Sequence, residues 1–136
     1  MDMKVLIAAT LMAACGVSRA QAVDAKNTVQ AIYPDLVRAN DTFAQRATVP
    51  SPLADNRAMY IVGFVRGSLV TLQVSRQEEG ADVSCAAVSV AATVAKLIAT
   101  IDDKPETRGM EYSAVIPVLL QYMYPCLKPS GFKPPR

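Results

Sequence analysis

The sequence predicts an all-α fold, a compact bundle of four to five helices stapled by one disulfide. Apolar residues recur at three- and four-residue spacing over most of the chain, which is the period of an amphipathic helix. Alanine, leucine and valine abound and tryptophan is absent, a composition that favours helices. Cys85 and Cys126 are the two cysteines that remain once an N-terminal leader is set aside. An even cysteine count in a small exported domain predicts a disulfide.

Residues 1–22 are predicted to be a signal peptide. Lys4 supplies a positive charge, residues 5–14 form an apolar run too short to span a bilayer, and small residues follow. Cleavage is expected near Ala20 or Ala22, so we expect a periplasmic protein. In an alternative interpretation, the sequence around Cys15 is a lipoprotein cleavage box, and the mature chain is anchored through that cysteine.

The rest of the chain is predicted to form one helical domain, residues 23–127, followed by a flexible proline-rich tail, residues 128–136. A domain of this size buries a modest core and gains from a disulfide. Its charges are dispersed along the sequence, so no nucleic-acid partner is expected. No second apolar run approaches about 18 residues without a charge, so no transmembrane span is expected either.

The first helical pattern covers residues 24–40 and is interrupted by Pro34. Proline removes a backbone donor and crowds the preceding turn. The pattern therefore predicts either one kinked helix or two short ones, the second beginning at Pro34. Residues 41–50 show no sustained period and are interpreted as a linker.

The next helix is predicted to run from Pro52 to about Gln77, with Ser51 as its N-cap. One apolar stripe on it follows the helical period and is expected to face the core: Ala58, Ile61, Val62, Val65, Leu69 and Leu72.

A neighbouring face of the same helix carries Tyr60, Gly63, Gly67 and Val74. Each glycine costs about 1 kcal/mol relative to alanine in a helix interior. Two glycines on one face therefore predict that another helix approaches closely there. We expect this packing to occur within the domain; the alternative is a homodimer interface.

The clearest helical pattern begins after Ser89, its predicted N-cap, and continues to about Ile101. Its apolar positions fall on one face, and Thr93 and Lys96 belong to the opposite face. The last pattern covers residues 110–124 and contains Pro117. That proline either kinks the last helix or lies in the first turn of a helix capped by Ser113.

Two acidic segments are the candidate partner-binding sites. The first is the loop at residues 77–83, and the second is the charged turn at residues 102–109. Loops carried by rigid helices are frequent contact elements in binding proteins. The candidate side chains are Glu78, Glu79 and Asp82 in the first segment and Asp102, Asp103 and Glu106 in the second.

The residue types that most catalytic sites need are missing. The chain has no histidine, which excludes Ser-His-Asp and Cys-His triads and histidine metal sites. The two cysteines lack the spacing of a zinc or thioredoxin-type site. Adjacent carboxylates on turns are more often solvated or capping residues than acid–base pairs. We therefore expect no enzymatic activity and no cofactor. Buried free thiols are the alternative to the disulfide.

From Asp35 to Cys126, the order of several short patterns resembles the Rap/Tai family of small periplasmic immunity proteins. The matching features are a Tyr-x-x-Gly-x-x-x-Gly helix, a cysteine before a capped helix, a Pro-Glu turn and a final aromatic-Pro-Cys. They are met here by Tyr60, Gly63, Gly67, Cys85, Ser89, Ile101, Pro105, Glu106, Tyr124, Pro125 and Cys126. Members of this family neutralise peptidoglycan amidase toxins that type VI secretion delivers.

The chain also departs from the family pattern. Many members carry a further cysteine pair, and the corresponding segments here, residues 37–40 and 57–59, contain no cysteine. The usual Cys-x-Pro reads Cys85-Ala86-Ala87. The resemblance implies a periplasmic protein that occludes the active site of a secreted amidase toxin. An alternative is an acid-stress chaperone resembling the HdeA type, which exposes apolar surface at low pH.

Overall fold

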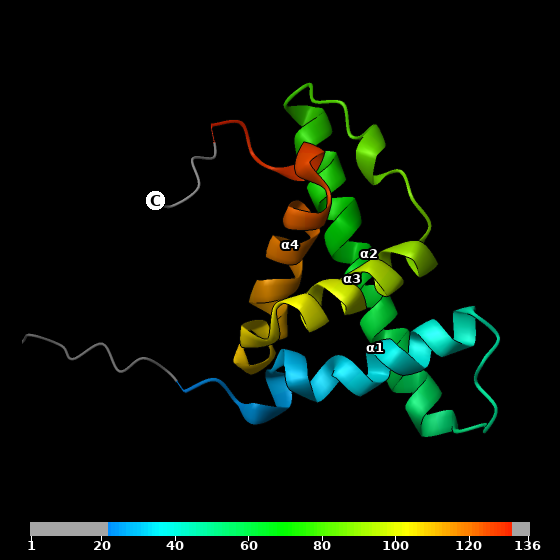
Figure 1. The fold of residues 1–136 in the computed structure, drawn as a ribbon. Helices are drawn as coiled ribbons and strands as arrows, with labels where there is room; N and C mark the ends of the chain where they lie inside the picture. The colour runs from blue at the N-terminus through cyan, green and yellow to red at the C-terminus, as the bar shows by residue number, and fades with distance from the viewer. Residues whose placement is uncertain (1–21, 132–136) are drawn as a thin grey trace, which may run out of the picture.

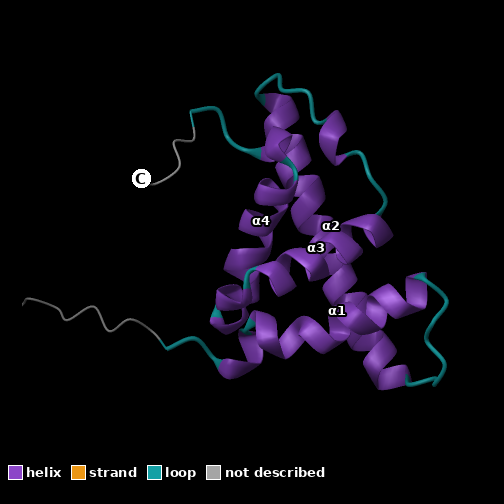
Figure 2. Cartoon of the chain, viewed as in Figure 1, coloured by secondary structure: helices purple, strands orange, loops and turns teal. Residues whose placement is uncertain are grey.

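The computed structural model describes residues 22–131. The predicted leader up to residue 21, including Cys15 and the cleavage position at Ala20, lies outside the described residues, as does the tail from residue 132. Within residues 22–131 the chain forms four α-helices and no strand (Figure 2). A single isolated β-bridge pairs Thr28 with Glu111. The all-α prediction is confirmed.

The four helices are α1 (Val29–Phe43), α2 (Pro52–Glu78), α3 (Val90–Asp103) and α4 (Tyr112–Met123). Four short 3-10 helices lie before, between and after them: η1 (Ala25–Asn27), η2 (Ser84–Ala86), η3 (Pro105–Gly109) and η4 (Pro125–Leu127). The long helix α2 runs through the molecule, and the other three helices pack against it (Figure 1).

The core lies where these helices meet. The stripe predicted on α2 is buried from Ala58 to Leu69, and Leu72 packs against it partly buried. Burying such aliphatic side chains is the main source of stability in a domain of this size. The largest fully buried side chains come from all four helices and from η4: Leu36, Val65, Leu97, Ile101, Ile116, Leu120 and Leu127.

Local capping explains where two of the helices begin. Thr28 accepts a hydrogen bond from the backbone N–H of Ala31 at 3.2 Å, and Ser89 accepts one from Ala92 at 3.1 Å. The predicted cap at Ser89 is therefore confirmed. Ser51 occupies the N-cap position of α2, but its hydroxyl makes no capping bond. Instead its backbone N–H donates to Asp55 at 3.4 Å.

Both internal prolines lie within continuous helices. Pro34 is the sixth residue of α1, so the two-helix alternative is wrong, and α1 continues to Phe43, into the predicted linker. Pro117 is the sixth residue of α4, and Glu111 rather than Ser113 holds the N-cap position. The suggested cap at Ser113 is wrong because the helix starts at Tyr112, two residues earlier than a cap at Ser113 would place its start.

The prediction that Thr93 lies on the polar face of α3 is wrong. Its side chain is buried, with 0% of its surface exposed. Its hydroxyl lies 3.2 Å from the hydroxyl of the buried Tyr124 and donates to the carbonyl of Ser89 at 3.2 Å. The polar face of α3 is therefore covered at this turn, because η4 and the residue before it fold back over it.

The disulfide prediction is confirmed, and the free-thiol alternative is wrong. Cys85 in η2 and Cys126 in η4 are bonded, with their Cα atoms 6.1 Å apart. Arg76 near the end of α2 donates to the carbonyl of Cys126 at 3.4 Å. The cross-link therefore joins the segment after α2 to the end of α4, at one end of α2 (Figure 1).

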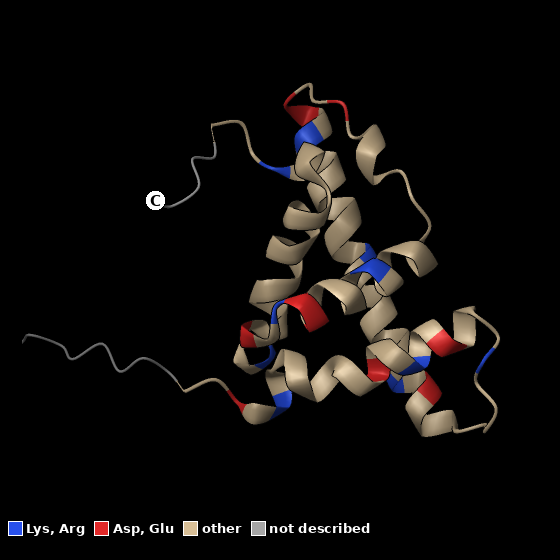
Figure 3. Cartoon of the chain, viewed as in Figure 1, with Lys and Arg blue, Asp and Glu red and all other residues tan. Residues whose placement is uncertain are grey.

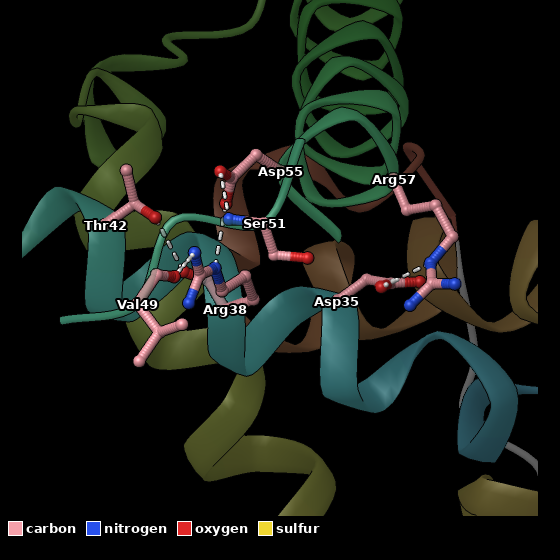
Figure 4. Close-up of polar contacts among 7 residues, drawn as sticks. All are labelled: Asp35, Arg38, Thr42, Val49, Ser51, Asp55 and Arg57. Atoms are coloured by element: carbon pink, nitrogen blue, oxygen red, sulfur yellow. Dashed lines mark hydrogen bonds and ion pairs between the residues drawn. The ribbon is translucent and has the colours of Figure 1, made fainter. Parts of the chain in front are cut away.

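Two ion pairs fasten α1 to the first part of α2 (Figure 4). Arg38 on α1 contacts Asp55 at 2.8 Å and also donates to the carbonyl of Val49 at 2.5 Å. Asp35 on α1 accepts from Nε of Arg57 at 3.1 Å. These contacts fix the crossing of the two helices at the end opposite the disulfide.

By length and composition, α2 alone among the described helices could cross a membrane. Core helices of globular domains pass the same test, so it is weak evidence. Here one face of α2 packs against three other helices. Three arginines also lie along the helix, at positions 57, 66 and 76, and such charges are costly inside a bilayer.

Candidate binding surface

The six acidic candidates do not form one site. Glu78, Glu79 and Asp82 lie at the C-terminal end of α2 and in the loop that follows. The other three lie at the end of α3 and in η3. Figure 3 shows these acidic groups at separate places on the molecule, so they do not form one acidic patch.

In the first acidic segment, two of the three side chains already have structural partners. Glu79 forms an ion pair with Arg76 and accepts from the hydroxyl of Ser130. Asp82 accepts from the backbone N–H of Ser84 at 2.8 Å. This hydrogen bond holds the pKa of Asp82 below its usual range. Glu78 is exposed and makes no ion pair within the part of the chain that the structure describes.

In the second segment, Asp102 fastens the turn to α1. Its Oδ1 accepts from the hydroxyl of Tyr33 and from Nη2 of Arg108, each at 2.7 Å. The hydrogen bond to Asp102 raises the pKa of Tyr33, and the guanidinium of Arg108 lies 4.4 Å from the Tyr33 ring centroid. Asp103 and Glu106 are exposed, and neither forms an ion pair in residues 22–131.

The glycine face of α2 is open rather than packed. An ideal Cβ built on Gly63 or Gly67 meets no atom within 4 Å, and Tyr60 is 66% exposed. The prediction that these residues pack inside the domain is therefore wrong for the described chain. Whether the face meets a second copy stays a prediction.

These residues belong to a longer feature, which we call the α2 stripe. Its eight positions alternate in steps of three and four residues along α2, and every one is exposed. This is the spacing of a coiled-coil seam. The sequence contains this spacing along the whole helix, of which the predicted face around Tyr60, Gly63, Gly67 and Val74 is only a part. The stripe comprises Leu53, Asn56, Tyr60, Gly63, Gly67, Val70, Val74 and Gln77.

Hollows border the stripe on both sides. A groove of about 560 Å³ lies between Val70, Val74 and the loop around Asp82. Another of about 390 Å³ lies between Gly67, Phe64 and Pro117 of α4. The second half of α2 is thus a raised surface between two grooves, and it is lowest at Gly63 and Gly67, which have no side chains. Another helix or an extended loop can pack against a surface of this shape.

Residues 22–131 hold no cluster of three or more histidine, cysteine or acidic side chains that could bind a metal ion. Comparison of the chain with protein-family models, with curated proteins and with solved structures found no match. The geometry itself is therefore the basis for any functional proposal.

Proposed function

We propose that the protein is a periplasmic immunity-type binding protein that neutralises a type VI secretion peptidoglycan amidase by occluding its active site. The α2 stripe is the observation that carries this proposal. It exposes Leu53, Tyr60, Val70 and Val74 in one line on a helix whose opposite face is anchored in the core. Exposed apolar surface arranged in this way is typical of protein-binding faces.

The exposed acidic side chains assist rather than form the main contact. Glu78 stands at the end of α2, close in sequence to the last stripe residue, Gln77. Asp103 and Glu106 stand at a separate place, beyond the end of α3. A toxin seated on the stripe can therefore reach Glu78, whereas contact with the turn at 102–109 requires a second point of attachment.

The test is coexpression with secreted amidases encoded beside this gene. We expect a stable complex and rescue of cells from amidase toxicity. Val74→Asp places a charge on the stripe and should abolish rescue. The matched control is Val118→Asp, because Val118 is 63% exposed on α4, outside the stripe. If Val74→Asp and Val118→Asp rescue equally well, the stripe is not the binding face; if no neighbouring amidase is bound, the immunity function is wrong.

A second function, an acid-stress chaperone, is favoured by the way α1 is held. The ion pair of Asp55 with Arg38 needs an ionised carboxylate, and the hydrogen bond from Arg38 holds the pKa of Asp55 below its usual range. Protonation of Asp55 would loosen α1 and uncover the apolar face beneath it. Protection of an aggregation-prone client at about pH 3 tests it. A protein that keeps its near-ultraviolet circular dichroism there and protects no client would exclude this function.

A further inference from the structure

A third hollow, away from the disulfide, differs from the other two in its charge. It has a volume of about 340 Å³ and forms where η1, α1, α2 and the start of α4 meet. The bridge between Thr28 and Glu111, and the bond from Val29 N–H to the Met110 carbonyl at 2.9 Å, hold the N-terminal segment against α4 here. We call this hollow the basic pocket. Lys26, Asn27, Asn56, Arg57, Tyr60 and Tyr112 contribute to its lining.

Arg57 enters this pocket with part of its hydrogen-bonding capacity unused. Its Nε is held by Asp35 at 3.1 Å, as Figure 4 shows. Its two terminal nitrogens donate no hydrogen bond within residues 22–131, and the Arg57 side chain is 58% exposed. A guanidinium fixed through Nε presents its remaining donors as a fork, the arrangement that matches a carboxylate.

A second cation and two amides complete the lining. The side chain of Lys26 makes no ion pair in the described part of the chain. With Arg57 it gives two positive charges against the one carboxylate of Asp35, so the lining is positive by one charge. Asn27 and Asn56 offer both donors and acceptors to a peptide bond.

Two tyrosines supply the apolar and hydroxyl parts of the site. The neighbouring Tyr60 hydroxyl and partial burial raise the pKa of Tyr112. Tyr112 therefore keeps its proton at neutral pH and adds no negative charge that would repel an anion. The exposed ring of Tyr60 gives the carbon atoms of a ligand a surface to pack against.

From this lining we propose that the basic pocket binds an α-carboxylate at the end of a short peptide. Arg57 and Lys26 hold the carboxylate, the two asparagines bond the last peptide group, and the tyrosine rings cover the terminal side chain. The volume is at the lower end of the range for small-molecule sites, which suits one or two residues. The basic pocket shares Asn56 and Tyr60 with the first half of the α2 stripe, but Val70 and Val74 do not line it. The proposal does not depend on the proposed function.

The test is a titration of the full chain with N-acetyl-alanyl-alanine, followed by amide NMR shifts and by calorimetry. We expect saturable binding below about 10 mM, with shifts centred on residues 26–27 and 56–60. The same dipeptide with an amidated C-terminus should bind about tenfold more weakly, because it cannot accept two charge-assisted bonds. A titration with free alanine is the third comparison. If free alanine binds as tightly as the dipeptide, the carboxylate site stands and its ligand is a free amino acid.

Variants separate ligand contact from loosening of the fold. Arg57→Gln should weaken binding of the acid form about tenfold and erase the preference over the amide. Arg38→Gln is the matched control, because it breaks the other α1–α2 ion pair without touching the pocket. Equal binding of acid and amide, no binding at 10 mM, or the same loss in Arg38→Gln as in Arg57→Gln would overturn the proposal.

Discussion

Thr93 shows how a single hydroxyl can couple two distant parts of the chain. Helical periodicity assigns it to the polar face of α3, yet Tyr124, 31 residues later, covers it. No local pattern predicts this contact, because it depends on how the chain turns after α4. Lys96 strengthens the same junction, donating to the Met123 carbonyl at 3.0 Å with its ammonium 4.8 Å from the Tyr124 ring centroid.

Thr93→Val should lower the free energy of unfolding by about 1–3 kcal/mol, because it leaves the buried Tyr124 hydroxyl without its partner. Urea unfolding measures the change. Thr100→Val is the matched control, since the Thr100 hydroxyl bonds only the Lys96 carbonyl of its own helix. The double variant Thr93→Val, Tyr124→Phe should lose less free energy of unfolding than the sum of the two single variants. Strict additivity of the two losses would show that the two hydroxyls do not interact.

Asp55 should make stability depend on acid. The hydrogen bond from Arg38 holds the pKa of Asp55 below its usual range, so the ionised form is the one that stabilises the fold. This contribution is present above the ordinary aspartate pKa of about 3.9 and is lost as the pH falls through the lowered folded-state value.

Asp55→Asn should therefore have a lower free energy of unfolding than the parent protein at pH 7. At about pH 2 the two proteins should be equally stable. Urea unfolding at both pH values gives the comparison. Asp103→Asn serves as the control, because Asp103 forms no ion pair in residues 22–131. A deficit of the same size at both pH values would mean that Asp55 acts through packing rather than through charge.

At the scale of elements, the sequence predicts helix positions well where capping is local. Ser89 and the Ser51-Pro52 pair mark the starts of α3 and α2. The two prolines were harder to place, because a proline at the sixth position of a helix lacks one backbone donor but can be tolerated when the helix is packed. Pro34 and Pro117 both lie in helices whose flanks are buried.

The pattern of α2 predicts its buried face correctly but does not show that its other apolar face stays exposed. Apolar residues follow a helical period on two of its faces, one containing Val65 and the other Val70 and Val74. The positions of α1, α3 and α4 decide whether the second face is also covered, and these depend on contacts between segments far apart in the sequence. The expectation that Gly63 and Gly67 mark close packing within the domain is wrong for the described residues, because no atom lies within 4 Å of a Cβ built on either glycine.

Gly63→Ala and Gly67→Ala should each raise the free energy of unfolding by about 0.5–1 kcal/mol, because alanine favours the helix and its methyl group meets nothing within 4 Å. Thermal unfolding of the isolated protein checks this. A partner that approaches these two glycines closely would instead be repelled, so the same variants should weaken the proposed complex with an amidase. Destabilisation of the isolated protein at low concentration would contradict the open surroundings of the glycines.

At the scale of the whole molecule, one covalent bond supplements a small core. The Cys85–Cys126 bridge closes a loop over a sequence separation of 41. The bridge reduces the conformational entropy of the unfolded chain, which adds about 4 kcal/mol to the free energy of unfolding in the chain-entropy description. The pairing was predictable because only two cysteines follow the predicted leader, whereas the location of the bridge at one end of α2 was not predictable.

Reduction with dithiothreitol should lower the free energy of unfolding by about 2–4 kcal/mol. Urea unfolding with and without reductant measures the loss. The Cys85→Ala, Cys126→Ala double variant should be equally destabilised and should not respond to reductant. If the oxidised and reduced proteins unfold at the same urea concentration, the bridge does not limit the unfolded chain.

The two ends of α2 are secured by different means. The disulfide secures the C-terminal end of α2. At the N-terminal end, near Asp55 and Arg57, α1 is attached by side-chain contacts alone (Figures 1 and 4). In heavy water, backbone deuteration should accordingly spread inward from α1 through partial opening, while α4 and the final turns of α2 exchange only with global unfolding. We therefore expect unfolding to begin at α1 and to reach the cross-linked end of α2 last.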